Sequence, residues 1–268
     1  MARRRTWKAL ALLPVLLLTA AGCAKSIAPV GEDRQLRFTR PGKLTTCTHL
    51  PYEPFQFVQD GKKVGFDVEL VDDIARDLGL QQELFDTPFE GIQSGEALNT
   101  RKCDVAAAAI TITPTRQQNM NFSDPYFDAD QALLVKKGAA DKELAALRGK
   151  VLGVQLGTTG EEYANEHRAE FGYQVRQYED VALLESSVQN GSVDAAINDN
   201  GVLLHFAKNN PDTEVSTEIP TGEKYGIGVQ QGNGPLLAKV NESLAKAKAD
   251  GEYDRIYQKW IGKPPDRP

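Results

Sequence analysis

The sequence predicts an α/β protein built from two similar units. Short strands rich in β-branched or small residues alternate with segments of helical period from about residue 43 to residue 220. The connections between them are short, which favours parallel strands with helices on both faces of a sheet. The alternation starts again near Gln131, so we expect two α/β units of modest size.

The first unit is predicted in the order strand, helix, strand, helix, strand. We predict strands at three segments: 44–48, which is β-branched, 81–89, and 103–112, which is rich in small apolar residues. The apolar residues of the first predicted helix share one face: Leu70, Val71, Ile74, Ala75 and Leu78. We expect Asp67 to cap the start of this helix and Gly79 to follow its end. Residues 90–102 suit a short helix and a turn.

The second unit repeats this alternation. We predict strands at four segments: 131–137, 151–157, 174–179 and 193–199. Helices are predicted between them at three segments: 141–150, 158–171 and 180–192. The chain then continues with the segment YGIGVQ at 225–230 and two helical stretches at 234–251 and 252–262.

Polar groups gather where four of the predicted strands end. Thr111 and Arg116 come at the end of the third strand, and the loops 50–55, 156–160 and 198–201 follow three others. Ligands of open parallel sheets bind beyond the carboxyl ends of the strands. Four such ends from two units, facing one another, predict a ligand cleft.

The types of residue in this cleft suit a small zwitterion. Arg116 can grip an α-carboxylate through two parallel hydrogen bonds, and Thr111 can add a hydroxyl. The helix start near residue 159 offers free backbone N–H groups to the same anion. Asp199 can accept from an α-ammonium group, while Tyr52 and Phe89 can supply apolar walls. Taken alone, the arginine could be a surface residue and the aspartate a helix cap.

Catalytic and metal motifs are missing from the sequence. The only histidines, His49, His167 and His205, are far apart and lack the spacing of metal ligands. The segment GIQSG is not a nucleophile elbow, and no phosphate-binding loop is present. We therefore expect a binding protein without cofactor or metal, and not an enzyme.

The first 42 residues have the pattern of an export signal followed by a tether. Four cations precede an apolar stretch at 9–21, which is too short to span a membrane and ends at Cys23. The segment LTAAGC resembles a bacterial lipobox, with Ala20 in place of the usual leucine. We expect removal of residues 1–22, lipidation of Cys23 and a flexible tether to residue 42, on the outer face of a bacterial cell membrane. The alternative is ordinary signal cleavage with an incidental cysteine.

The net charge limits the kinds of binding partner that we expect, and the cysteine content suggests a disulfide. The net charge of −6 becomes about −10 without residues 1–22, which carry four cations and no acidic residue. Such an acidic chain lacks the basic footprint of a nucleic-acid-binding protein. Apart from Cys23, only Cys47 and Cys103 remain, and in an exported protein such a pair suggests a disulfide. Two buried thiols are the alternative.

Four segments together resemble the polar amino acid-binding proteins of ABC importers: GFDVELVDDIARDLG, AITITPTRQQNMNFSDPYF, GVQLGTTGEEYA and DGEYDRIYQKWIG. The resemblance runs from about residue 42 to residue 262. It implies a two-lobed periplasmic-binding-protein fold of the Venus-flytrap type II class with two hinge crossovers. The implied boundaries are 43–125 plus 226–268 for lobe 1, 131–220 for lobe 2, and 126–130 and 221–225 for the hinge.

The resemblance also implies roles for individual residues. Arg116, Thr111 and Thr159 match the groups that bind the ligand α-carboxylate. Asp199 matches the acceptor of the α-amino group, and Ala109 contributes there through its backbone carbonyl. Four residues match positions that contact the ligand side chain: His49, Tyr52, Phe89 and Gln155.

The expected mechanism is capture by cleft closure and delivery to an ABC importer permease by a monomeric protein. The absence of a fixed negative charge at His49 and Gln155 favours glutamine or glutamate as ligand, although Glu53 and Glu90 could restore one. One rival hypothesis is a small-acid enzyme on the same fold, with His49 as general base. Another is the ligand-binding domain of a sensor.

Overall fold

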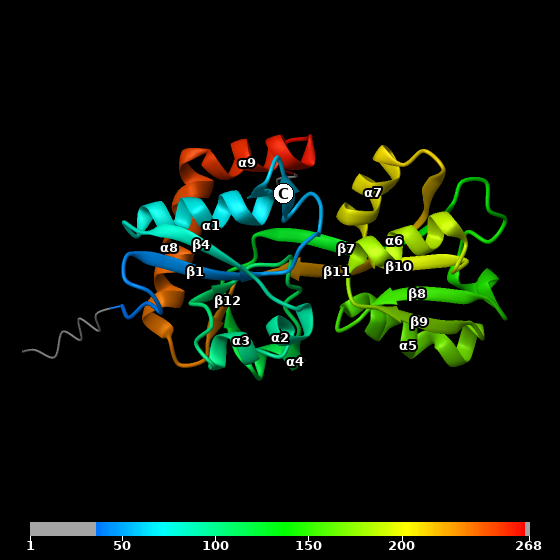
Figure 1. Cartoon of the computed structure of the whole chain (residues 1–268), viewed down its shortest axis with the longest axis horizontal. Helices are drawn as coiled ribbons and strands as arrows, with labels where there is room; N and C mark the ends of the chain where they lie inside the picture. The colour runs from blue at the N-terminus through cyan, green and yellow to red at the C-terminus, as the bar shows by residue number, and fades with distance from the viewer. Residues whose placement is uncertain (1–35, 266–268) are drawn as a thin grey trace, which may run out of the picture. The chain divides into compact units, whose positions relative to one another are not determined.

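The computed structural model describes residues 36–265. The predicted signal segment, Cys23 and the tether up to residue 35 lie outside this range. Within it, two lobes are each built on a five-stranded sheet flanked by helices (Figure 1). No helix in the described range is long and apolar enough to cross a lipid bilayer.

Lobe 1 is organised around a mixed sheet. Its strands run in the order β4 (Gln81–Asp86), β1 (Lys43–Thr48), β5 (Val105–Ala106), β12 (Gly228–Gln230) and β6 (Met120–Phe122). β1 is parallel to β4 and β5, whereas β12 is antiparallel to both of its neighbours. The three strands predicted for the first unit are therefore parallel as expected, and the returning chain adds β12 in the opposite direction. A hairpin of β2 (Phe57–Gln59) and β3 (Lys62–Val64) lies beside the sheet.

Helices cover both faces of this sheet. One face carries three helices: α1 (Phe66–Asp77), α8 (Gly234–Asp250) and α9 (Glu252–Ile261). Their apolar side chains share a core with Leu44 and Val229 of the sheet. The other side carries α2 (Phe89–Gln93), α3 (Glu96–Asn99) and α4 (Pro114–Gln117). There Ile92 and Leu98 pack against Cys47 and Ala106 in a separate core.

Two local predictions for lobe 1 were wrong. Of the predicted strand 103–112, only Val105 and Ala106 join the sheet, and Thr111 forms an isolated bridge with Tyr225. In between, Ala109 takes a left-handed backbone conformation with φ 49°. Asp67 does not cap helix α1, whose N-cap is Gly65. Instead the buried Asp67 carboxylate accepts from the Ala109 N–H at 2.7 Å, which turns the chain out of the sheet toward the cleft.

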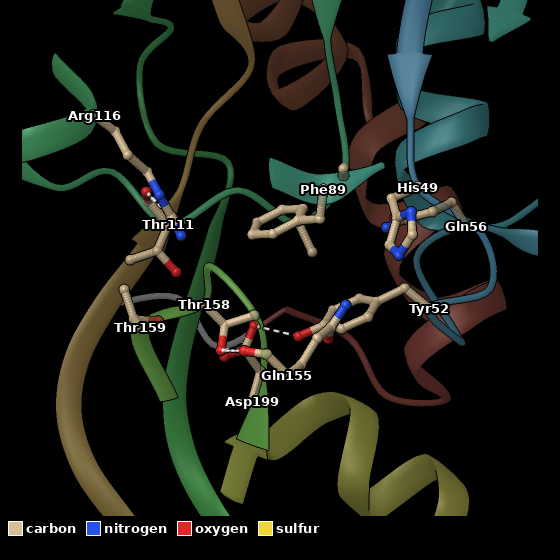
Figure 2. Close-up of a pocket in the computed structure, with 12 residues that line it drawn as sticks. His49, Tyr52, Gln56, Phe89, Thr111, Arg116, Gln155, Thr158, Thr159 and Asp199 are labelled. Atoms are coloured by element: carbon tan, nitrogen blue, oxygen red, sulfur yellow. Dashed lines mark hydrogen bonds between the residues drawn. The ribbon is translucent and has the colours of Figure 1, made fainter. Parts of the chain in front are cut away.

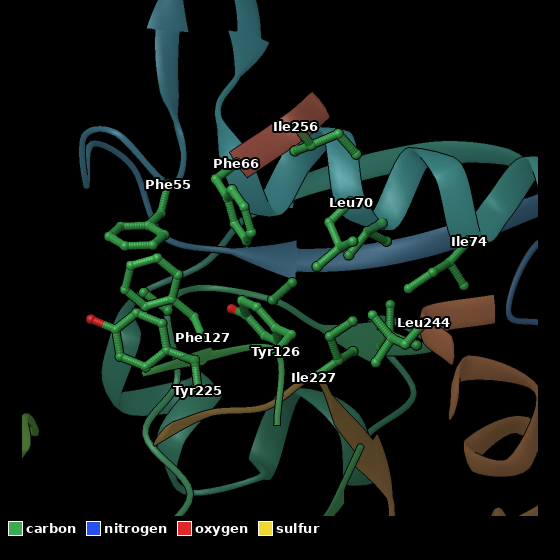
Figure 3. Packing of buried hydrophobic residues seen from close by; sticks show 14 of the residues in the cluster. Phe55, Phe66, Leu70, Ile74, Tyr126, Phe127, Tyr225, Ile227, Leu244 and Ile256 are labelled. Atoms are coloured by element: carbon green, nitrogen blue, oxygen red, sulfur yellow. The ribbon is translucent and has the colours of Figure 1, made fainter. Parts of the chain in front are cut away.

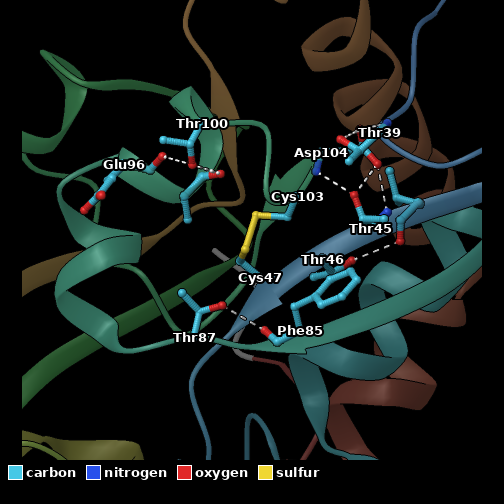
Figure 4. The surroundings of a disulfide bond; sticks show 12 residues. Thr39, Thr45, Thr46, Cys47, Phe85, Thr87, Glu96, Thr100, Cys103 and Asp104 are labelled. Atoms are coloured by element: carbon cyan, nitrogen blue, oxygen red, sulfur yellow. Dashed lines mark hydrogen bonds between the residues drawn. A yellow bond between two sulfur atoms is a disulfide. The ribbon is translucent and has the colours of Figure 1, made fainter.

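A disulfide links two neighbouring inner strands of the lobe 1 sheet (Figure 4). Cys47 of β1 and Cys103, just before β5, are joined with their Cα atoms 5.6 Å apart. Next to it the Asp104 carboxylate accepts from the backbone N–H of Thr45 at 2.9 Å and of Thr39 at 2.7 Å. The disulfide and these hydrogen bonds connect β1, the segment before it and the start of β5.

Lobe 2 follows the predicted alternation closely. Its sheet runs in the order β11 (Thr213–Tyr225), β7 (Phe127–Lys136), β10 (Ala195–Asp199), β8 (Val151–Gln155) and β9 (Gln174–Tyr178). The last three strands are parallel. Flanking them are η1 (Leu144–Leu147), α5 (Thr159–Phe171), α6 (Val181–Asn190) and α7 (Asn200–Asn209). Neither α7 nor the long strand β11 was predicted from the sequence.

β7 and β11 connect the lobes as an antiparallel pair. Their register shifts between Ile219 and Glu223, and Phe127 pairs with Tyr225 at the lobe 1 end. An aromatic cluster anchors that end (Figure 3). There the ring of Phe55 lies edge-on to Phe127 and Tyr225, with centroids 4.9 and 5.3 Å away. The predicted hinge residues belong to or adjoin this strand pair, and their flexing stays a prediction.

Candidate functional site

A small cavity lies between the carboxyl ends of strands from the two lobes (Figure 2). In this structure its volume is about 10 Å³, room for about one water molecule, so the side chains from the two lobes lie close together around it. All nine residues predicted to contact a ligand line it: His49, Tyr52, Phe89, Ala109, Thr111, Arg116, Gln155, Thr159 and Asp199. Gln56, Ala108 and Thr158 also line the cavity and were not predicted. Glu53 and Glu90, considered as sources of negative charge, are exposed and are not among the lining residues.

Arg116 is a buried cation contributed by lobe 1. It lies in the four-residue helix α4, whose N-cap Thr113 accepts from the Arg116 backbone N–H at 3.2 Å. Its guanidinium donates to the Thr111 carbonyl at 2.8 Å and, across the cleft, to the Gly157 carbonyl at 3.0 Å. The guanidinium also lies over the ring of Phe89, 5.4 Å from its centroid. Burial lowers the pKa of Arg116, which reflects the cost of holding a cation away from water.

Asp199 is a buried anion contributed by lobe 2. It ends β10 and is the N-cap of α7. Its carboxylate accepts from the Tyr52 hydroxyl at 2.8 Å, from the Gln131 amide at 2.7 Å and from the Tyr225 hydroxyl. Burial, and next the charge of Glu223, raise the pKa of Asp199 to about 6, while these hydrogen bonds act in the opposite direction. A cationic group of a ligand would favour its charged form.

Glu223 of β11 is a second carboxylate beside the cavity that sequence reasoning missed. It accepts from the hydroxyls of Thr111 at 2.9 Å and Thr159 at 2.8 Å, one from each lobe. The Gln131 amide donates to it at 3.1 Å. Both predicted carboxylate-binding hydroxyls are thus engaged with Glu223 in this structure. No local sequence signal marks Glu223, because its position depends on the pairing of β7 with β11.

The remaining predicted residues form the other end of the cavity. The Tyr52 hydroxyl oxygen lies 2.7 Å from the side-chain oxygen of Asn198, and the Asn198 amide donates to Gln155 at 3.1 Å. His49 approaches the ring of Phe89, with centroids 6.3 Å apart. Gln56 belongs to the same loop as Tyr52, and the two residues form an isolated β-bridge. Its closeness to Tyr52 in the sequence could therefore have indicated that Gln56 lines the cavity.

The N-terminus of α5 borders the cavity next to these groups. Its N-cap Thr158 accepts from the Glu161 N–H at 3.2 Å, and Thr159 is the first helical residue. Among residues 36–265, no group of three or more His, Cys, Asp or Glu side chains could hold a metal ion. A cation on one wall and an anion on the other make the site complementary to a zwitterion.

Comparison with known proteins decides the family. The profile of the bacterial extracellular solute-binding proteins, family 3, matches residues 44–263. The chain belongs to this family. The resemblance recognised in the sequence is thereby confirmed, and so is the two-lobed α/β fold.

Three similar proteins show how far the likeness extends. The ABC transporter glutamine-binding protein GlnH of Bacillus subtilis is 36% identical over 76% of this chain and 75% of its own length. The L-cystine-binding protein TcyJ of Escherichia coli K12 is 32% identical over 91% of each chain. A solved structure of an ancestral arginine-binding protein bound to glutamine is 41% identical, covers 84% of this chain and 100% of its own, and has a TM-score of 0.79.

Proposed function

We propose that this protein captures a free amino acid in its interlobe cavity and delivers it to the permease of an ABC importer. One observation carries the proposal: the buried Arg116 and Asp199, of opposite charge and from opposite lobes, line the same small cavity. An amino acid zwitterion offers a carboxylate to the first and an ammonium to the second. Two buried charges are retained in a protein when a partner compensates them.

The side chain of the ligand is the finer part of the proposal. We favour glutamine or glutamate, because the cavity lining adds no acidic residue to Asp199. GlnH and the ancestral protein, whose names include glutamine, support the first of these. Arginine, for which the ancestral protein is named, and cystine, for which TcyJ is named, belong in any test.

Closure of the lobes around the ligand is the proposed mechanism. The cavity walls come from both lobes, so a ligand held by Arg116 gains its contacts with Asp199 and Thr159 only when the cleft shuts. Contacts that exist only in the closed form shift the population toward it. Bending would take place in residues 126–130 and 221–225. We further propose a lipid anchor on Cys23, an extracytoplasmic location and a monomeric protein that binds its ligand without turnover.

A thermal-shift panel on the chain from Ala24 onward tests this function. The twenty amino acids, cystine, ornithine and several dicarboxylates are each added, and a ligand at 100 times its dissociation constant should stabilise by about 2.7 kcal/mol. The unfolding midpoint should then rise by about 5–10 °C for one or two amino acids. The shift should vanish in Arg116→Ala and in Asp199→Ala. No shift with any amino acid would refute the proposal, and recovery of chemically altered ligand would indicate an enzyme instead.

A further inference from the structure

The two ends of the cavity differ in how their polar atoms are used. In Figure 2, Arg116 and Thr111 lie at one end, His49 and Gln56 lie at the other, and Phe89 lies between them. The polar atoms of Arg116 and Thr111 have partners within the protein. At the other end, the Nε2 atom of His49 and the Oε1 atom of Gln56 are buried and have no hydrogen-bond partner among the described residues.

These unpartnered atoms point to a ligand. Gln56 is 1% exposed, and buried polar groups are almost always hydrogen-bonded, since leaving one unpaired is costly. Both residues line the cavity, so a bound molecule lies next to both side chains. The loop that carries Gln56 is held in place, because the backbones of Tyr52 and Gln56 exchange hydrogen bonds of 2.7 and 3.1 Å.

Hydrogen-bond chemistry defines what the two atoms require. The Nδ1 atom of His49 lies 3.1 Å from the backbone oxygen of Thr87. A carbonyl only accepts, so Nδ1 carries the hydrogen and Nε2 of the neutral imidazole is left as an acceptor. The Gln56 Oε1 atom is also an acceptor. As the two side chains are oriented in this structure, each has an unpartnered acceptor at this end of the cavity.

We infer that His49 and Gln56 form an acceptor pair that selects amino acids whose side chains carry N–H donors over those with a carboxylate. This inference rests on the proposed function, in which Arg116 holds the α-carboxylate of the ligand and Asp199 its α-ammonium group. It makes Gln56 a specificity-determining residue. A carboxamide, a guanidinium or an imidazole satisfies the pair. A carboxylate offers only acceptors, so it leaves Nε2 of His49 unpaired, needs the Gln56 amide to turn its NH2 group toward it, and adds a negative charge.

The test compares ligands of equal shape. Isothermal titration of the mature chain at pH 8 measures the dissociation constants of glutamine, glutamate, arginine and alanine, the last being too short to reach the pair. We expect glutamine to bind at least about ten-fold more tightly than glutamate. Gln56→Ala should weaken glutamine about ten-fold and change alanine less than two-fold. Gln56→Glu, which keeps the shape and adds a charge, should raise the preference for arginine over glutamine at least about ten-fold.

The controls separate this inference from the proposed function. Gln59→Ala, at an exposed glutamine of β2, should leave every dissociation constant unchanged. Gln56→Glu keeps the test decisive if Gln56→Ala folds poorly, as judged by its unfolding midpoint without ligand. Glutamate binding as tightly as glutamine would overturn the inference, and so would an equal loss for all ligands in the Gln56 variants. Failure of the proposed function looks different, because then no amino acid binds at all.

Discussion

The two lobes bring opposite charges to the cavity and position them by different means. In lobe 2, Asp199 ends a regular parallel strand and receives hydrogen bonds from Tyr52, Tyr225 and Gln131. In lobe 1, Arg116 sits on a four-residue helix after a segment that has left its sheet. Neither lobe alone presents both charges. The difference teaches that the two buried charges line one cavity only when the lobes are together.

We expect the largest effect on ligand affinity when the lobe 1 charge is removed. Arg116→Ala should weaken amino acid binding by about 100- to 10,000-fold, since two charged hydrogen bonds of about 1.5–3 kcal/mol each are lost. Isothermal titration measures the change. Arg116→Lys should recover little of it, because an ammonium cannot make paired bonds to a carboxylate. Arg148→Ala, at an exposed arginine of lobe 2, is the matched control. If Arg116→Ala and Arg148→Ala bound the ligand with equal affinity, the charge of Arg116 would not contribute to binding.

The disulfide is found in lobe 1 alone, so its removal should affect that lobe. Cys47 and Cys103 are separated by 56 residues, and closing a loop of that length stabilises by about 4 kcal/mol in the chain-entropy account. A variant with both cysteines changed to alanine should lose about 2–4 kcal/mol of unfolding free energy in urea. Reductant should destabilise the parent protein and not the variant. A variant as stable as the parent would show that the bridge contributes little to lobe 1.

The lobe 2 charge should make binding depend on pH. The pKa of Asp199 is about 6 in the folded protein, so its ammonium-binding form disappears as the pH falls below 6. Affinity should then fall about ten-fold per pH unit. The stability of the ligand-free protein should move the opposite way. A carboxyl whose folded pKa is raised contributes stability at low pH that is lost as the pH rises through about 6.

Comparison with Asp199→Asn isolates this group. Burial also raises the pKa of Asp67 to about 7 and of Glu185 to about 8, and both act on stability with the same sign. The difference between the parent and Asp199→Asn should therefore change by about 2.5 kcal/mol between pH 4 and pH 7 in urea titrations of the ligand-free protein. Identical pH profiles for the two proteins would contradict the burial argument.

The smallest expected effect belongs to the crossover strand between the lobes. Glu223 is the second cause of the raised pKa of Asp199, so Glu223→Gln should move the acid midpoint of binding to lower pH by less than about one unit. The same titrations measure it, with Glu218→Gln at an exposed position of β11 as control. A shift to higher pH would mean that the charge of Glu223 does not act on Asp199.

The parts of the site that the sequence predicted are those with local signals. In lobe 2, the caps Thr158, Asp180 and Gly191 delimit helices between strands, so the strand end at Asp199 follows from the alternation. The change from the apolar segment 105–110 to the polar residues around Arg116 can also be read from the local sequence. Whether these residues bind a ligand in the predicted roles stays a prediction.

The missed parts depend on contacts between distant segments. Glu223 lies 112 residues from its partner Thr111. β11 was not predicted, although β-branched residues alternate with polar ones at Thr213, Val215, Thr217 and Ile219. Asp67 was assigned as a cap from its position near a helix start. Its actual partners, the Ala109 N–H and the Tyr126 hydroxyl, lie 42 and 59 residues away. Pairings at such separations leave no periodic trace in one sequence.

The chain path through the lobes has a consequence for the making of the protein. Lobe 1 begins at the N-terminal side, is interrupted by the whole of lobe 2, and receives β12, α8 and α9 last. The apolar faces of α8 and α9 belong to the same core as α1. During synthesis and export, lobe 2 can therefore fold first. The N-terminal part of lobe 1 lacks its packing partners until the final residues are made. A prematurely ended chain would keep an intact second lobe and an open, aggregation-prone first one.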